Sequence, residues 1–469
     1  NVNRELKAEE FAWFHLFPYG NNGLNEERSV KITPLDYFQQ RVLSSDTRFQ
    51  RTDYLYYALS MFEYLLVQLT ISACGRGIQG QEGVVEDLHL HLKNLRGSAS
   101  YWRTAHSELI AFIRCLGPPT WFITLNCNDL NCLHMRKAFL IADGRPDEDP
   151  SQLNLDENCG SPHVHLVVWI DKAPSFESPE GLTYIDQVIS CRLPSEEEDP
   201  DLRALVTRNQ IHRHTHTCHK NNSETCRFAF PSERCEQTRI APPSSDEFIR
   251  NGGRFCTLKR TTNEKWANNY NQQILKFFNA NMDIQPCGSN ESIAHYIAKY
   301  ISKTEPANVK EGVAEAIRQI RRDETNIAKK LFKSCMRILK ERQVSASECV
   351  YRLCHLPLRS SSRKCVFLNS RKPDQRYQVL RFENNKAVGL CSNIFERYAK
   401  RPRQQEQGYD FQNMCLLEFA MNFEPLYSKK AEDSEESVDA EAEEQPTRRR
   451  LIKLTNNPKM VIRNVPAVV

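Results

Sequence analysis

Two histidines lie one residue apart in a stretch rich in valine, leucine and other strand-forming residues. Because side chains alternate across a β-strand, His163 and His165 are expected on one face. Val164, Leu166 and Val168 are then expected to point into a core. Two neutral imidazoles side by side on a rigid strand supply half of a divalent-metal site. Such a pair also occurs among ordinary surface and core histidines, so it needs support from other residues.

Two tyrosines and two lysines each recur four residues apart in the segment 296–303. On a helix, Tyr296 and Tyr300 share one face, and the lysines share a neighbouring one. A tyrosine can attack a phosphodiester and hold the DNA end as a phosphotyrosine. A metal ion, together with Lys299 and Lys303, would stabilise the charge that develops on the phosphate. An amphipathic helix with two half-buried tyrosines is the alternative interpretation of the same spacing.

Histidines and cysteines are concentrated between residues 212 and 226. Zn²⁺ takes four Cys or His ligands tetrahedrally, and short spacings joined by a loop are typical of such sites. We take Cys218 and Cys226 as the thiolate candidates for a structural zinc, and His212 and His214 as the imidazole candidates. A histidine-rich surface loop that contacts DNA is the alternative. Further residues that could replace one of the four are His216, His219 and Cys235.

The composition is that of a soluble globular protein, with 40% hydrophobic and 26% charged residues among 469. The longest apolar stretch, Ala58–Ala73, contains Glu63 and Gln68, so we expect a buried amphipathic helix there and no membrane span. Seventeen cysteines, an odd number without regular spacing, argue against a secreted disulfide scaffold.

The charge is unevenly distributed. The net charge is +4, but Ala431–Glu444 holds eight acidic residues and no Lys or Arg, which leaves +12 on the rest of the chain. A basic body with an acidic linker suits a polyanionic partner, DNA or RNA. A solvated charged surface gives the same counts and is the alternative.

Hydrophobic periodicity places the candidate residues on defined elements. A helix is expected over Tyr101–Leu116, where Gly117 and the prolines after it end the pattern. A strand is expected over Trp121–Leu125, and a capped helix over Ser289–Lys303. Val309–Gln343 is expected to form a long basic helical region.

Several of these segments, in this order, resemble the replication-initiator region of Helitron transposases. The resemblance extends over most of residues 88–425. Because several motifs occur together, it is more specific than the histidine or tyrosine pair alone. The motifs that carry it are Leu95–Ser98, Tyr101-Trp102, Leu116–Leu125, Gly160–His165, Cys226–Pro231, the paired-tyrosine segment, Tyr351–Leu353, Leu356–Leu358 and Glu396–Pro402.

The resemblance implies an α+β fold: a Rep-like HUH nuclease core with a small antiparallel sheet flanked by helices. The histidine strand would lie in the centre of the sheet, beside the strand Trp121–Leu125, with the tyrosine helix packed across the site. The substrate implied is single-stranded DNA at transposon ends, with no small-molecule substrate. The residue roles implied are His163 and His165 as ligands of Mg²⁺ or Mn²⁺, Tyr296 and Tyr300 as nucleophiles, and Lys299 and Lys303 as phosphate contacts.

The sequence departs from the family pattern in two places. Relatives carry a longer segment before Gly160 that contributes an acidic or amide residue near the metal; here Asp156 or Glu157 is the candidate third ligand. The chain also lacks the phosphate-binding pattern G-x-x-x-x-G-K-[ST]. Helitron transposases continue into an ATP-driven helicase, so we expect a helicase domain in the full-length protein and assign no ATPase activity to this chain.

From these observations we predict a leading function and a division of the chain into five segments. The function is a metal-dependent nuclease and strand transferase for single-stranded DNA, located in the nucleus. A decayed, inactive transposase that only binds nucleic acid is the alternative, and a host-domesticated zinc-containing binding module is a third hypothesis. The segments are a helical region (1–95), the nuclease domain (96–305) with a zinc-binding-like insertion (206–235), a basic extension (306–430), an acidic linker (431–450) and the start of a following domain (451–469).

Overall fold

A computed structural model gives the fold, and the chain divides into two compact units. One unit is formed by Leu116–Tyr300, and the other by Asn1–Cys115 together with Ile301–Val469. No helix among the described residues is long and apolar enough to cross a bilayer. The structure describes residues 5–30, 32–77, 99–128, 132–142, 144–152, 163–214, 218, 226, 228–242, 245–250, 254–288, 307–342, 344–370, 372, 380–383, 386–390, 393–425, 451–453, 459–463 and 465–469.

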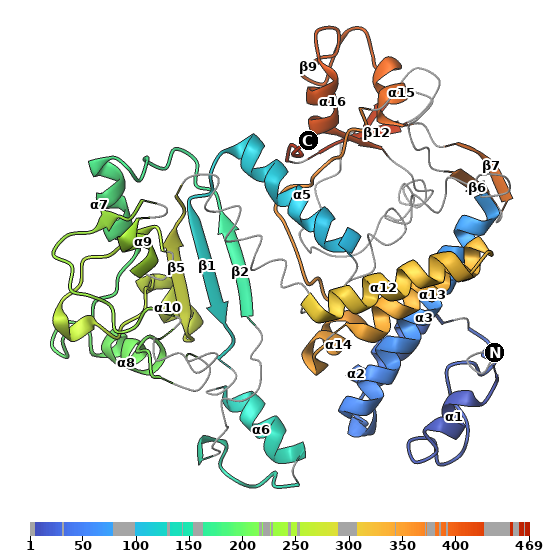
Figure 1. Ribbon diagram of the computed structural model, residues 1–469, viewed down its shortest axis with the longest axis horizontal. Coiled ribbons are helices and arrows are strands. Elements are labelled where there is room, and N and C mark those ends of the chain that lie inside the picture. Colours follow the sequence, from blue (N-terminus) through green and yellow to red (C-terminus); the bar gives the residue numbers. More distant parts are fainter. Residues whose placement is uncertain are drawn as a thin grey trace, which may run out of the picture. The chain divides into compact units, whose positions relative to one another are not determined.

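A three-stranded antiparallel sheet organises the unit Leu116–Tyr300 (Figure 1). Its strands are β1 (Trp121–Asn126), β2 (His163–Val168) and β5 (Met282–Pro286), in the order β2-β1-β5. The strand expected over 121–125 is confirmed as β1. The expectation that the histidine strand occupies the centre of the sheet is wrong, because β1 takes that place and pairs with both neighbours.

One face of this sheet is covered by a hydrophobic core. Trp121 and Ile123 of β1 and Met282 and Ile284 of β5 are buried in it, together with apolar side chains from three of the surrounding helices. The other described elements of the unit are α6 (Leu133–Ala142), η4 (Pro150–Gln152), α7 (Pro179–Val188), α8 (Pro200–Asn209), β3 (Arg239–Ile240), α9 (Asp246–Arg250), β4 (Cys256–Thr257), η6 (Thr262–Glu264) and α10 (Gln272–Phe278).

Helices α7, α8 and α10 begin at residues that are suited to cap them. Ser178, Asp199 and Asn271 each accept a hydrogen bond from a backbone N–H in the first turn, and α7 and α8 continue with proline at the first helical position. The caps fix where each helix starts. The apolar residues Ile185, Leu202 and Leu275 can therefore face the sheet.

The edge strand β2 is only partly covered. Val168 packs against the core, as expected. Val164 and Leu166 are 43% and 37% exposed, so the expectation that they point into a core is wrong. The reason is their position: the core lies under β1 and β5 and reaches β2 only at its end.

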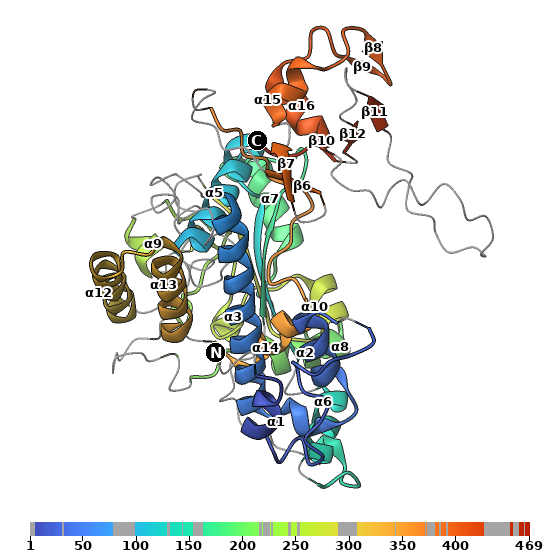
Figure 2. The same cartoon turned by 90° about the vertical axis from the view of Figure 1, so that its right-hand side faces the viewer.

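The second unit is built on the long helix α3 (Thr52–Gly77), which runs beside α13 (Ile327–Glu341) and α14 (Ala346–Leu353) (Figure 1 and Figure 2). The buried carboxylate of Glu63 on α3 forms ion pairs with Arg342 and Arg352. The basic region expected over 309–343 forms two helices among the described residues. The other described elements of the second unit up to residue 323 are α1 (Ala8–Ala12), α2 (Pro34–Leu43), η2 (Thr47–Gln50), α5 (Ala99–Leu116) and α12 (Ala307–Asp323).

Residues on both sides of the acidic run share a small core. Strand β12 (Lys459–Ile462) pairs with both β10 (Phe423–Pro425) and β11 (Leu451–Lys453). Met460 and Ile462 pack with phenylalanines of residues 411–423. The remaining described elements are β6 (Leu380–Glu383), β7 (Lys386–Leu390), α15 (Ile394–Ala399), β8 (Gln405–Glu406), β9 (Tyr409–Asp410) and α16 (Leu416–Asn422). Helices and small antiparallel sheets together confirm the predicted α+β class.

Candidate metal centres

The histidine pair lies on the face of the sheet opposite the hydrophobic core. The rings of His163 and His165 meet edge to face, with centroids 4.9 Å apart. Nδ1 of His165 lies 3.0 Å from the hydroxyl oxygen of Thr124, which is directly opposite on β1. The same ring stacks on Phe122 with a centroid distance of 5.5 Å and an interplanar angle of 19°. Strand pairing, a hydrogen bond and stacking therefore fix the orientation of His165.

The third strand adds a carboxylate and an amide to this face. Asp283 is opposite Thr124 on the other side of β1. The side-chain amide of Gln285 donates a hydrogen bond of 2.6 Å to Oδ2 of Asp283. Oδ1 of Asp283 is buried and has no hydrogen-bond partner among the described residues. Burial raises the pKa of this carboxyl above its usual range, while the positive charge of Arg254 acts in the opposite direction.

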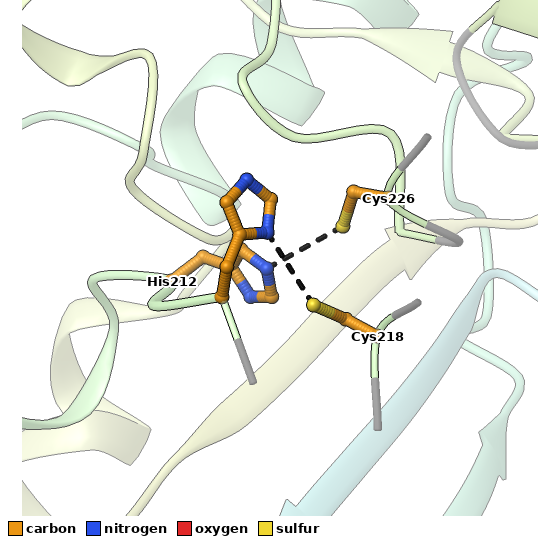
Figure 3. Close-up of side chains that lie close together, drawn as sticks. His212, Cys218 and Cys226 are labelled. Carbon is orange, nitrogen blue, oxygen red and sulfur yellow. Dashed lines mark hydrogen bonds between the residues drawn. The ribbon is translucent and has the colours of Figure 1, made fainter. Parts of the chain in front are cut away.

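A second candidate centre is formed by His212, His214, Cys218 and Cys226. One ligand atom from each residue can be chosen so that all four lie within 4.8 Å of one another. Nε2 of His212 is 3.4 Å from Sγ of Cys226, and Nδ1 of His214 is 3.3 Å from Sγ of Cys218. Figure 3 shows the labelled side chains of His212, Cys218 and Cys226 pointing toward a common centre.

Aromatic rings and backbone hydrogen bonds hold the two imidazoles. His212 stacks on Phe230 with a centroid distance of 4.5 Å, and His214 meets the ring of Trp266 edge to face at 5.1 Å. The backbone N–H of His212 donates to the carbonyl of Trp266 at 2.8 Å. Cys218 is only 1% exposed. The ligand atoms are thus fixed by neighbours outside the loop that carries them.

The donor set and its spacing fit Zn²⁺. Two imidazoles and two thiolates are a common structural zinc set. With Zn–N and Zn–S bonds of about 2.0 and about 2.3 Å in a tetrahedron, an N···S distance of about 3.5 Å is expected. The two measured N···S distances agree with this value, so small movements of the other ligand atoms would complete the coordination.

The three substitute ligands do not enter this cluster among the described residues. Cys235 is buried elsewhere, and its thiol donates to the carbonyl of Gln237 at 2.9 Å. His216 and His219 lie outside the described residues. The four residues brought together by the fold are those singled out by their spacing.

Residues 68–149 match the family model of the Helitron helicase-like domain at N-terminus. Over these residues the chain is similar to that domain. The matched segment includes α5, β1 and α6, and it ends before the histidine strand. A search of curated proteins finds no match. The predicted resemblance to the N-terminal region of Helitron transposases is thus confirmed over residues 68–149, and the roles of individual residues remain proposals.

Several predicted residues lie outside the part of the chain that the structure describes. They include both candidate nucleophiles and both candidate third ligands, so the predicted approach of the tyrosines to the histidines stays a prediction. The residues concerned are Asp156, Glu157, Tyr296, Lys299, Tyr300 and Lys303.

The structure also brings two residues to the histidine face of the sheet that sequence reasoning missed. Thr124 belongs to a strand that was predicted without a role for its side chains, and Asp283 lies far along the chain from the histidines. The one available signal for Asp283 was an acidic residue between Met282 and Ile284, at the polar position of an alternating strand.

Proposed function

We propose that this Helitron-type chain is a metal-dependent endonuclease and strand transferase that acts on single-stranded DNA. One observation carries the proposal: the rings of His163 and His165 lie together on a sheet face, and Thr124 and Phe122 fix the orientation of one of them. Two oriented imidazoles on a rigid strand are suited to hold a divalent ion. The match of residues 68–149 supports a phosphodiester at a transposon end as the proposed substrate.

Metal binding and nucleophilic attack are assigned to different residues in the proposed reaction. His163 and His165 would hold Mg²⁺ or Mn²⁺, which supplies Lewis-acid polarisation of the scissile phosphate when bound. The phenolic oxygen of Tyr296 or Tyr300 forms a bond to phosphorus, and the P–O bond to the adjacent nucleotide breaks. That nucleotide leaves with a free hydroxyl, and the other DNA end remains on the tyrosine. Attack by a DNA hydroxyl on the phosphotyrosine reverses the step and joins two ends.

A structural zinc is part of the same proposal. His212, His214, Cys218 and Cys226 would hold Zn²⁺, and all four positions are then filled by protein ligands. A closed site of this kind stabilises a fold and leaves no open position for catalysis. The side chain of Asn268 donates to the carbonyl of Met282 at 3.0 Å, and its backbone N–H donates to the carbonyl of Gln210 at 2.7 Å. Through Asn268, the residues just before His212 are thereby hydrogen-bonded to strand β5, which carries Asp283.

The alternative function is nucleic-acid binding without cleavage. The exposed apolar side chains of Val164 and Leu166 favour this alternative. Loss of a segment that packs on β2 would leave an edge strand with uncovered apolar residues of this kind. Such a protein would bind DNA with an affinity that falls steeply with salt, because phosphate contacts dominate.

A covalent-adduct assay separates the two functions. The purified chain is incubated with Mn²⁺ and single-stranded DNA labelled at either end, then resolved on a denaturing protein gel. A labelled adduct that requires metal and disappears in Tyr296→Phe/Tyr300→Phe is expected, and the two single variants rank the tyrosines. DNA binding without any adduct would contradict the nuclease and leave the binding function.

A further inference from the structure

Helix α13 carries its basic residues along one side. Five of its 15 residues are basic and one is acidic, which gives the helix a net charge of +4. At about 100° per residue, the five basic side chains fall within an arc of about 100° around the helix axis, over a length of about 16 Å. We call them the basic face: Lys329, Lys330, Lys333, Arg337 and Lys340.

The basic face points to solvent, because the opposite side of the helix is buried. Lys329, Lys333 and Lys340 are exposed, and the other two members of the face are partly exposed. On the opposite side, apolar residues of α13 pack in a core with α3, which runs beside it (Figure 2). This core fixes which side of α13 faces outward.

Acidic side chains compensate only part of this charge. Glu324 pairs with Lys333 at 2.7 Å, and Glu341 pairs with Arg337 at 3.0 Å. The side chains of Lys333 and Arg337 are 56% and 39% exposed, so solvent screens both pairs. Among the described residues, the remaining three members of the basic face form no ion pair. The face therefore keeps most of its positive charge.

A row of exposed cations without exposed aromatic rings is suited to the backbone of a duplex. The one aromatic residue of α13, Phe332, packs against Tyr64 of α3 with ring centroids 5.5 Å apart. Proteins that hold single strands add aromatic rings on which unpaired bases stack. In a duplex the bases are paired, and Lys and Arg contact the phosphates without reading the sequence. The basic face therefore suits double-stranded DNA better than a single strand.

Two other uses of a basic amphipathic helix require a free apolar side. A helix at a membrane surface buries its apolar side among lipid chains, and a peptide-like helix lays that side into the groove of a partner protein. In α13 this side is covered, because Leu331, Cys335 and Ile338 are buried together with Val67 of α3. The side left open to a partner is the basic face.

We propose that the basic face of α13 binds the phosphate backbone of double-stranded DNA, independently of base sequence. This surface belongs to the unit formed by Asn1–Cys115 and Ile301–Val469, whereas both candidate metal centres belong to Leu116–Tyr300. The choice of DNA over RNA rests on the proposed function. The contact holds the duplex that adjoins a single-stranded transposon end, so the chain binds both forms of DNA.

The test measures the affinity of the full chain for a fluorescein-labelled DNA duplex, by fluorescence anisotropy over a range of salt concentrations. Lys329→Gln/Lys333→Gln/Lys340→Gln should weaken duplex binding by about 10-fold or more at about 0.1 M salt. The slope of log K against log salt should become shallower by about 2–3, because each lost phosphate contact removes about 0.9. Two duplexes of unrelated sequence should lose affinity equally.

The matched control removes the same number of charges from the same unit. Arg48→Gln/Arg51→Gln/Arg403→Gln changes three exposed arginines outside α13 and should bind the duplex as the wild type does. Glutamine favours a helix nearly as well as lysine does, so the α13 variant should keep the wild-type melting temperature. It should also keep adduct formation on a short single strand, because the basic face belongs to neither metal centre.

Four results would overturn this inference. Three are an unchanged duplex affinity and salt slope, equal losses in the α13 variant and the control, and a loss confined to single-stranded DNA or to an RNA duplex. The fourth is tighter duplex binding by the α13 variant, which would point to an acidic occupant of the face such as Ala431–Glu444. A wild type that binds the duplex through α13 but forms no adduct would keep this inference and contradict the proposed nuclease.

Discussion

The hydroxyl oxygen of Thr124 lies 3.0 Å from Nδ1 of His165, across the pairing of strands β1 and β2. A hydrogen bond at one ring nitrogen fixes the plane of an imidazole and determines which nitrogen faces a metal. With Nδ1 directed to Thr124, Nε2 is the nitrogen that would ligate. Stacking of the His165 ring on Phe122 favours the same orientation.

Replacing Thr124 by valine therefore should weaken the metal site without harming the fold. Thr124→Val keeps the shape of the side chain and removes the hydroxyl. We expect Mn²⁺ affinity and the rate of adduct formation to fall by about tenfold or more, as for other residues that orient a metal ligand. Thr183→Val is the control, because Thr183 is an exposed residue of α7 whose hydroxyl donates to the backbone carbonyl of Pro179. Equal Mn²⁺ binding by Thr124→Val and the wild type would contradict an orienting role.

Strand β1 and the His/Cys cluster could be predicted because each depends on residues that are close together in the sequence. A short run of aromatic and β-branched residues predicts a strand over Trp121–Leu125, and the spacing of four possible ligands within one loop predicts the second centre. The fold brings these four together as predicted, because backbone and ring contacts to Trp266 and Phe230 hold the loop.

The order of the strands could not be predicted because it depends on long-range pairing. Nothing within residues 163–168 indicates that β1, rather than β2, is central. The same limitation explains the wrong prediction for Val164 and Leu166. Both residues are apolar, as in a buried strand, but the core reaches β2 only at Val168. Asp283 was missed for a related reason: its place opposite Thr124 is created by the pairing of segments far apart in the chain.

The buried ion pairs of Glu63 predict a large effect on stability. The side chain of Glu63 is 1% exposed, and its partners Arg342 and Arg352 are also largely buried. Glu63→Gln would remove the charge that Arg342 and Arg352 share and leave Arg352 with only the longer, 4.0 Å contact to Glu348, so the free energy of unfolding should fall by about 3–5 kcal/mol. Chemical denaturation of the purified variant measures this change.

A surface ion pair in the same unit supplies the comparison for Glu63. Glu108 pairs with Arg359 at 2.9 Å, but both side chains are more than one third exposed. Because solvent screens exposed pairs, Glu108→Gln should change the free energy of unfolding by less than about 1 kcal/mol. Similar losses in the two variants would show that burial does not govern the strength of the Glu63 pairs.

Zinc content provides the test of the His/Cys cluster. The protein as purified should contain about one zinc per chain by elemental analysis, as expected for a single four-ligand site. Cys218→Ser and Cys226→Ser should lose that zinc and melt at a lower temperature, because metal binding to such a site contributes to folding. Chelation of the wild type should lower the melting temperature in the same way, and added Zn²⁺ should restore it.

Cys235→Ser is the matched control for zinc binding, because Cys235 is also buried in the same unit but its thiol donates to a backbone carbonyl. It should keep the metal, although loss of a buried thiol can lower the melting temperature. Zinc content that is absent from the wild type, or equal in Cys218→Ser and Cys235→Ser, would contradict the assignment.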